Sequence, residues 1–313
     1  MIMSLVEALG VLLALIGAAL WLRWRGVLQE AHSPTLSRLI TDLMLPALIF
    51  ASLSQHRLEW SQMPPALIML VTTLIMLALA WWIGRAIRLE APQLGAFTLV
   101  AGIGSSSTLG YTLIGQVFRG DPGAAFDAVM IGEIGAILPL FLVGVPIAIH
   151  FGKQDSSPGA HWREVRTFVR SPIFISMVGG FTVSFIDLPE WQVVDVMYRV
   201  LDILGGALPV FVALTIGLML RPVSLKTALV PIAAVLAVKL FVEPMLAAEL
   251  ATIAHVPRLE RNVLLIEASM PSGTIATIVA ARYGCDGGFA STVVVVSYVA
   301  SLVSVPIIVT LMA

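Results

Sequence analysis

Long apolar stretches, bounded by charged residues, Pro or Gly, follow one another along almost the whole chain. A helix that crosses about 30 Å of hydrocarbon needs roughly 20 mostly apolar residues. Ten stretches meet this requirement, at 2–22, 35–55, 64–84, 92–118, 124–150, 167–187, 192–220, 223–243, 259–282 and 288–312. The widest hydrophilic segment, 152–166, is too short for a soluble domain. The pattern therefore predicts an all-α integral membrane protein in which residues 1–313 form a single membrane unit.

Composition agrees with this prediction and excludes several functional classes. The chain is 58% hydrophobic and 12% charged, and its mean hydropathy is +0.98. Its 18 Lys and Arg against 19 Asp and Glu give a formal charge of -1, so it lacks the basic field that nucleic-acid binding requires. Cys285 has no second thiol for a disulfide or a metal site. The first stretch lacks the basic start and the cleavage site of a signal peptide, so we expect a retained span.

The distribution of Lys and Arg predicts the orientation of the chain. If the loops alternate between the two sides, twelve of the 18 lie on one side: Arg23, Arg25, Arg38, Arg85, Arg88, Lys153, Arg163, Arg166, Arg170, Arg221, Lys226 and Arg282. The other side carries Arg57, Arg119, Arg199, Arg258 and Arg261, and Lys239 falls inside a span. Short cytoplasmic loops are enriched in Lys and Arg. We therefore expect a protein of the cell (inner) membrane with both termini outside the cytoplasm.

The two halves of the chain resemble each other. Residues 43–50 read like 206–213 at an offset of 163, and 119–123 read like 283–287 at an offset of 164. The matches join span two with span seven, and spans four and five with spans nine and ten. Because each half holds an odd number of spans, the halves must be inverted. We predict an inverted repeat of 1–151 and 165–313, an architecture frequent in secondary transporters, which bind substrate where the halves meet.

The fourth and ninth spans correspond in this repeat, and both carry helix-breaking residues near their middles. At an offset of 164, Ser107 aligns with Pro271, so we expect the two breaks to coincide. Non-helical backbone at this depth is tolerated only where it is buried or lines a cavity. The restarted half-helices would aim their positive N-terminal ends at one central point, which suits an anion. The candidate substrate-binding residues are Gly104, Ser105, Ser106, Ser107, Thr108, Pro271, Ser272, Gly273 and Thr274. The alternative is that these small residues only allow close helix packing.

An ionisable residue inside a membrane span is energetically expensive and is a candidate for function, and four such residues stand out in the predicted spans. Glu133 and Glu267 flank the predicted breaks and could bind Na⁺ through oxygen ligands or carry a proton. Alternatively, each is a protonated carboxyl that joins two helices. Lys239 and Glu243 are spaced i, i+4 on one helix face, and we expect them to neutralise each other.

Three short runs near the C-terminus resemble a known family. The runs 270–273, 281–286 and 290–292 are similar to the C-terminal signature of the auxin efflux carrier family. The resemblance implies a fold similar to that of bile acid:sodium symporters, with a scaffold of spans 1, 2, 6 and 7 and a moving domain of spans 3–5 and 8–10 that contains crossed broken helices. It also implies transport of a small carboxylate, such as auxin or malonate, by an elevator movement. Ser105 and Thr112 stand where the family often has Asn and Pro, so a relative's substrate does not transfer to this chain.

The run 266–270 resembles the sodium-site stretch of the bile acid symporters, in which the Glu is a cation ligand. Glu267 and Met270 are therefore candidates for cation coupling, together with Glu133, and we favour Na⁺ at Glu267 over a proton. No other cofactor is expected. All five histidines fall in loops or at span ends, and the one Lys inside a span has a carboxylate one turn away, so the serines are expected to lack a free base and an intramembrane hydrolase is not favoured.

These observations favour a secondary carrier, with a channel or a non-transporting sensor as the alternatives. The expected partners are a small carboxylate and the lipid bilayer, and the choice between a monomer and a homodimer stays open.

Overall fold

The computed structural model describes residues 2–55, 63–118, 121–152, 166, 169–186, 192–219 and 225–312. These residues are almost entirely helical, and their one extended pairing is an isolated β-bridge. Six helical stretches in this part of the chain are long and apolar enough to cross a membrane: Glu30–Ala51, Met63–Ala86, Gly123–Phe151, Gln192–Leu218, Ala228–Ile253 and Gly287–Ile308. The all-helical, multi-pass character predicted from the sequence is confirmed.

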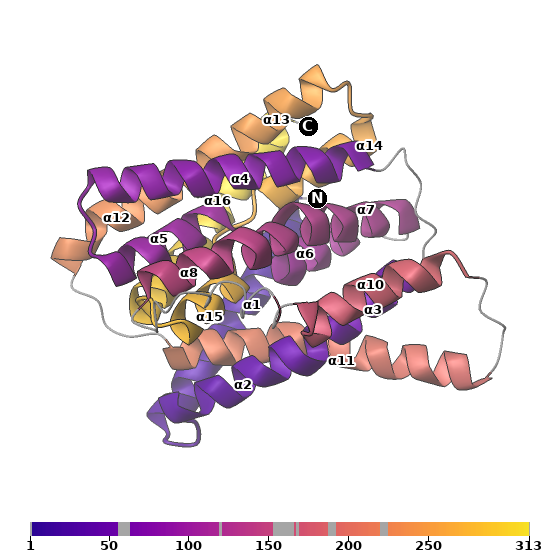
Figure 1. Ribbon diagram of the computed structural model, residues 1–313, viewed down its shortest axis with the longest axis horizontal. Coiled ribbons are helices and arrows are strands. Elements are labelled where there is room, and N and C mark those ends of the chain that lie inside the picture. The colour runs from indigo at the N-terminus through magenta and orange to yellow at the C-terminus, as the bar shows by residue number, and fades with distance from the viewer. Residues whose placement is uncertain are drawn as a thin grey trace.

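Helices occupy all ten predicted ranges (Figure 1). The first half contains α1 (Ile2–Trp24), η1 (Glu30–His32), α2 (Ser33–Leu39), η2 (Ile40–Met44), α3 (Leu45–Ser54), α4 (Met63–Ala86), α5 (Ala91–Gly102), η4 (Ser106–Gly110), α6 (Tyr111–Val117), α7 (Pro122–Gly132), η5 (Glu133–Ile137), η6 (Leu140–Gly144) and α8 (Val145–Phe151). The second half contains α10 (Pro172–Ser184), α11 (Gln192–Met219), α12 (Leu225–Ala237), η7 (Val238–Val242), α13 (Glu243–Ile253), α14 (Arg258–Ala268), α15 (Thr274–Arg282) and α16 (Gly287–Met312).

The eighth predicted span extends further than expected. The eighth span was expected to end at 243, but α13 continues the helix to Ile253. The expected end was wrong because Lys239 neutralises Glu243, and because the turn η7 accommodates Pro244 in the first turn of α13. The ends of the sixth, seventh and eighth predicted spans at 167–168, 187, 220 and 223–224 lie outside the described residues.

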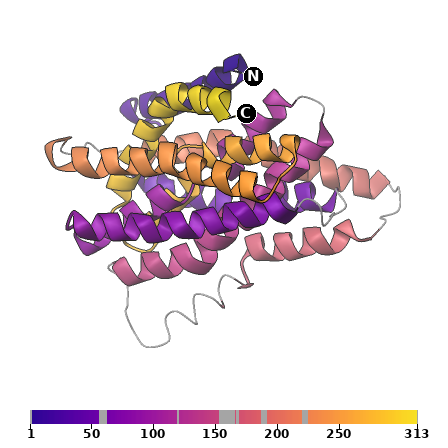
Figure 2. The same cartoon turned by 90° about the horizontal axis from the view of Figure 1, so that it is seen from above.

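The helices pack in two groups. α3 lies against α10 and α11, and α1 lies against α11. In the other group α4 packs on α5, α7 and α13, while α5 also contacts α8, α15 and α16. Figure 1 shows α4 and α13 on one side of the molecule, with α2, α3, α10 and α11 on the other. The groups meet where α1 packs on α16, which places the two termini near each other (Figure 2).

The surface of α4 illustrates how an apolar helix is used on both faces. Ala66, Met69, Met76 and Ala80 are buried against neighbouring helices. On the opposite face, Leu67, Val71, Leu74 and Ile75 are exposed although they are large and apolar. Exposed apolar residues at helical spacing over about two and a half turns would be unfavourable in water, and they match contact with lipid.

In the part of the chain that the structure describes, five short π-helical turns interrupt the helices: η2, η4, η5, η6 and η7. Four of them end two residues before a proline, namely Pro46, Pro139, Pro146 and Pro244. A proline inside a helix lacks an N–H donor and its ring clashes with the carbonyl four residues earlier, and a widened turn relieves that clash. Two of these turns carry a buried ionisable residue, Glu133 in η5 and Lys239 in η7, and π-helical turns are frequent at functional sites.

The fourth and ninth helical stretches are broken, as predicted. The first break lies at 103–105, between α5 and η4, and the second at 269–273, between α14 and α15. At the offset of 164 the first break maps onto 267–269, so the two breaks overlap only at position 269 and do not coincide fully as expected. The difference arises because α5 ends at Gly102, before the serine run begins, whereas α14 continues to the residue before Ser269.

Candidate functional site

The two breaks cross each other in the interior of the protein. Gly104 and Ser272 form an antiparallel β-bridge. The backbone N–H of Ser105 donates to the carbonyl of Pro271 at 2.9 Å, and the N–H of Gly273 donates to the carbonyl of Ile103 at 2.8 Å. These bonds satisfy backbone groups that the broken helices leave free, so the crossing is held by main chain rather than by side chains. We call residues 103–105 and 271–273 the crossover.

Glycine at the crossover is required by the close approach of the two backbones. A Cβ on Gly273 would lie 2.8 Å from the carbonyl oxygen of Gly104 and 3.0 Å from that of Ile103. Both distances are shorter than a normal carbon–oxygen contact, so any side chain at Gly273 would push the two segments apart.

Hydroxyl groups surround the crossover. The Ser105 hydroxyl hydrogen-bonds the Tyr298 hydroxyl at 2.6 Å, and the backbone N–H of Ser272 donates to Ser297 Oγ at 3.2 Å. The hydroxyls of Ser106 and Ser272 are buried and make no hydrogen bond of ordinary geometry with the described residues, although that of Ser106 interacts with the Glu267 carboxylate. An unpaired buried hydroxyl is unfavourable, so these two groups are available to a ligand.

One buried ion pair lies directly behind the crossover. The Lys239 ammonium in η7 pairs with the Glu243 carboxylate, and both side chains are completely buried. The mutual pairing predicted from their spacing is confirmed. Sequence reasoning did not foresee where the pair lies: a Cβ on Gly104 would be 2.7 Å from Lys239 Nζ. The ammonium therefore places a positive charge at the crossover.

Two buried carboxyl groups lie on the other side of the serine run. Glu267 is the last residue but one of α14. Any side chain at Gly110 in η4 would overlap its carboxylate. Its carboxylate interacts with the Ser106 hydroxyl, but neither of its oxygens makes a hydrogen bond of ordinary geometry within the described ranges. Glu133 in η5 accepts a hydrogen bond of 2.9 Å from the Tyr111 hydroxyl. Glu267 interacts electrostatically with both Lys239 and Glu133, so these charges form one cluster.

The structure brings most of the predicted site residues together. Gly104, Ser105, Ser106, Ser107, Met270, Pro271, Ser272, Gly273 and Thr274 are all buried at or beside the crossover. The side chains of Thr108 and Thr112 lie outside the described part of the structure. Tyr111, Tyr298, Ser297 and Lys239 join the site and were not predicted as members of it. For Lys239, the sequence did offer one indication of a functional role, because a charge within a membrane span is energetically costly.

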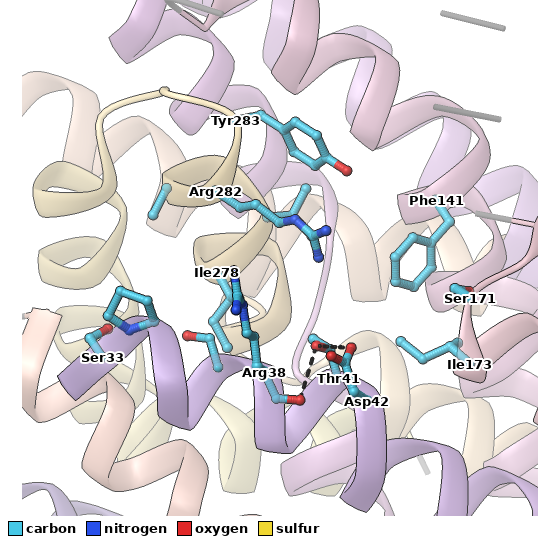
Figure 3. Close-up of a pocket in the computed structure, with 14 residues that line it drawn as sticks. Ser33, Arg38, Thr41, Asp42, Phe141, Ser171, Ile173, Ile278, Arg282 and Tyr283 are labelled. Carbon is cyan, nitrogen blue, oxygen red and sulfur yellow. Dashed lines mark hydrogen bonds between the residues drawn. The ribbon is translucent and has the colours of Figure 1, made fainter. Parts of the chain in front are cut away.

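A cavity of about 420 Å³ opens away from the crossover. Arg38 and Asp42 line it from α2 and η2, and Arg282 lines it from the last turn of α15. Figure 3 shows both guanidinium groups projecting into this space, opposite Phe141 and Ile173. None of the crossover residues lines this cavity, so it is separate from the predicted substrate site.

Cys285, in the turn between α15 and α16, is buried and its thiol donates to the Ala148 carbonyl at 3.4 Å. Burial, and to a lesser degree the nearby charge of Asp286, raises the pKa of this thiol to about 11. Thiolates are the reactive form. We therefore predict that a maleimide labels Cys285 very slowly at pH 7, and that the rate rises about tenfold per pH unit until the pH approaches the pKa.

The control for this labelling is Glu90→Cys in a Cys285→Ser background. Glu90 is exposed at the start of α5, its side chain makes no capping bond, and it is predicted to lie on the same side of the membrane. Its cysteine should label at the rate of a free thiol. Equal rates for the two cysteines at pH 7 would contradict the effect of burial on Cys285.

A helical membrane bundle with two broken helices is typical of membrane transport proteins. The chain matches the membrane transport protein family over residues 3–153 and 162–309, and it belongs to this family. The resemblance to the auxin efflux carrier family is thereby confirmed. The protein is a multi-pass membrane transporter and not an enzyme.

Two archaeal relatives are named as uncharacterized transporters. The one from Methanocaldococcus jannaschii is 25% identical over 268 residues, which cover 83% of each chain. The one from Methanothermobacter thermautotrophicus is 25% identical over 285 residues, which cover 90% of each chain. Both alignments therefore extend over most of the helices described above.

Proposed function

We propose that the protein is a secondary transporter of a small carboxylate, which binds at the crossover. The observation that carries this proposal is the buried Lys239 ammonium behind the bridge between Gly104 and Ser272. Around this charge, the unpaired hydroxyls of Ser106 and Ser272 can donate to an anion, and α15 directs its N-terminal end toward the same place. A carboxylate bound there would gain hydrogen bonds that the protein alone does not supply.

We further propose that a cation is bound with the substrate. Glu267 is buried beside the crossover, and its negative charge would repel a carboxylate unless it is neutralised. A Na⁺ ion prefers hard oxygen ligands, which the Glu267 carboxylate and the Ser106 hydroxyl can offer. Met270 would contribute its backbone carbonyl, since its thioether is a soft ligand. The described residues contain no group of three or more His, Cys, Asp or Glu that could hold a metal ion, so this site relies on neutral oxygens and one carboxylate.

An elevator movement fits the packing of the helices. The proposed scaffold contains α1, α2, α3, α10 and α11, and these helices contact one another extensively. The proposed moving domain contains α4 to α8 and α12 to α16, including both broken helices. In this proposal the crossover moves with the moving domain. The bound substrate is carried across the membrane while the backbone bridge stays intact.

The orientation with both termini outside the cytoplasm is also part of this proposal. Arg57, Arg119, Lys153, Arg163 and Arg221, which enter the orientation argument, lie outside the described residues. Labelling of Glu90→Cys in intact cells with a membrane-impermeant maleimide tests the orientation. If both termini lie outside the cytoplasm, position 90 is cytoplasmic and stays unlabelled.

The proposed coupling makes a specific prediction for Glu267→Gln. This change keeps the shape of the side chain but removes its titratable charge. The variant should fold, yet its uptake should lose the dependence on the coupling ion. The measurement is uptake of labelled malonate and indole-3-acetate by proteoliposomes, with Na⁺ and pH gradients imposed separately. In the parent protein the ion should tighten substrate binding about 5–150-fold, and the substrate should tighten ion binding by the same factor.

Glu249→Gln is the matched control, because Glu249 is an exposed acid on α13. It should retain full ion dependence. If Glu267→Gln also retains it, Glu267 is structural and the coupling proposal fails for this residue. A current without saturable uptake would instead identify a channel.

A further inference from the structure

The cavity lined by Arg38 and Arg282 has features that the crossover proposal does not use. The two arginines are exposed, and neither forms an ion pair with any described residue. They reach the cavity from elements far apart in the sequence: Arg38 from α2, and Arg282 from the end of α15 (Figure 3). Two unpaired guanidinium groups directed into one cavity repel each other, so an anion between them would stabilise the arrangement.

The rest of the lining indicates which anion fits. Phe141, Ile173 and Ile278 form an apolar wall, and Asp42 adds one negative charge to the two positive ones. Asp42 is also engaged locally, since it accepts a hydrogen bond of 2.9 Å from the Thr41 hydroxyl. The net charge of the lining is therefore one positive unit. This combination suits a singly charged carboxylate with an apolar body, held by the planar donor groups of the arginines.

The position of the cavity connects it with the crossover. α15 begins beside the crossover at Thr274 and ends at Arg282, which lines the cavity. At about 1.5 Å per residue, this nine-residue helix spans roughly 13 Å. The cavity is also bounded by elements of both helix groups, with α2, η2 and α10 on one side and η6 and α15 on the other.

We propose that this cavity is a second anion-binding site, which takes up a small apolar monocarboxylate between Arg38 and Arg282 one helix length from the crossover. Its role as a loading site on the transport path rests on the proposed function, whereas binding of the anion does not. Because the two arginines belong to different helix groups, a movement between the groups separates them and releases the ligand. The site thus binds only in one arrangement of the two groups.

Binding of 1-naphthoate to the full-length protein in nanodiscs tests the proposal, with 1-naphthalenemethanol as the uncharged analogue of similar size. The double variant Arg38→Gln/Arg282→Gln should weaken 1-naphthoate binding by at least about tenfold. Binding of the neutral analogue should change little. Asp42→Asn removes the negative charge from the lining and should tighten 1-naphthoate binding, a gain that misfolding does not produce.

Arg85→Gln is the matched control. Arg85 is exposed, lies on the same predicted side, and stacks 5.6 Å from the Trp81 ring much as Arg282 stacks 5.7 Å from the Tyr283 ring. It should leave binding unchanged. Equal binding by the parent and the double arginine variant overturns the proposal, whatever happens to transport. Ser106→Ala separates the two sites. If arginine-dependent binding persists in this variant, the second site is supported. If, in addition, no carboxylate is transported by the parent protein, only the proposed function is refuted.

Discussion

Lys239→Met is expected to destabilise the protein by about 3–5 kcal/mol. The substitution leaves the Glu243 carboxylate fully buried without its partner, and a buried unpaired charge is far more costly than the loss of an exposed ion pair. The measurement is the free energy of unfolding in a mixed-micelle titration. A variant as stable as the parent would show that water or another cation replaces the ammonium.

The double variant Lys239→Met/Glu243→Met separates the structural role of this pair from its proposed role in binding. Replacing both charges by apolar side chains of similar size should restore most of the stability, since neither charge is then left unpaired. Carboxylate uptake should nevertheless stay low, because the crossover has lost its positive charge. Restored uptake together with restored stability would mean that Lys239 serves the fold alone.

Gly273→Ala is expected to abolish transport and to cost about 1–3 kcal/mol of stability. The new methyl group would lie within 2.8–3.0 Å of two carbonyl oxygens of the opposite segment. Relief requires the segments to separate, which breaks the hydrogen bond from the Gly273 N–H to the Ile103 carbonyl. Uptake by proteoliposomes and thermal unfolding of the purified protein measure the two effects.

Gly115→Ala provides the control for this substitution. Gly115 lies in α6, and a Cβ there would meet no atom within 4 Å. Alanine in a helix interior is favoured over glycine by about 0.5–1 kcal/mol, so this variant should be as stable as the parent or more so. Similar losses in both variants would show that the crossover backbone has no special sensitivity.

The sequence contained enough information to predict the helices and the breaks. Apolar stretches of the length of a membrane span fixed where helices occur, and Pro271 with its neighbouring Ser and Gly marked the second break to within a few residues. Both features depend on local chemistry, which a single sequence reports directly. The first break was placed less accurately, because a run of serines tolerates helix and π-turn alike, and the neighbouring segment decides which one forms.

The site was predicted only in part, for physical reasons that lie outside any local pattern. The spacing of Lys239 and Glu243 predicted their pairing, yet the approach of Lys239 to Gly104 depends on how η7 packs against the crossover. The common cavity of Arg38 and Arg282 likewise requires α2 and α15 to border the same space, although they are more than 200 residues apart in the chain. Contacts between distant segments leave no periodic trace in one sequence.

The π-helical turns have a consequence for comparing this chain with its relatives. A π-turn holds one residue more than an α-helical turn of the same height, so it absorbs an inserted residue without rotating the helix that follows. A relative without the extra residue would then align with a one-residue gap in the middle of a membrane helix, where gaps are usually disallowed. If the gap is not opened, every position beyond the turn is assigned to its neighbour, and Lys239 would be matched to a residue on another face of the helix. At 25% identity, alignment of these helices should therefore be anchored separately before and after each turn.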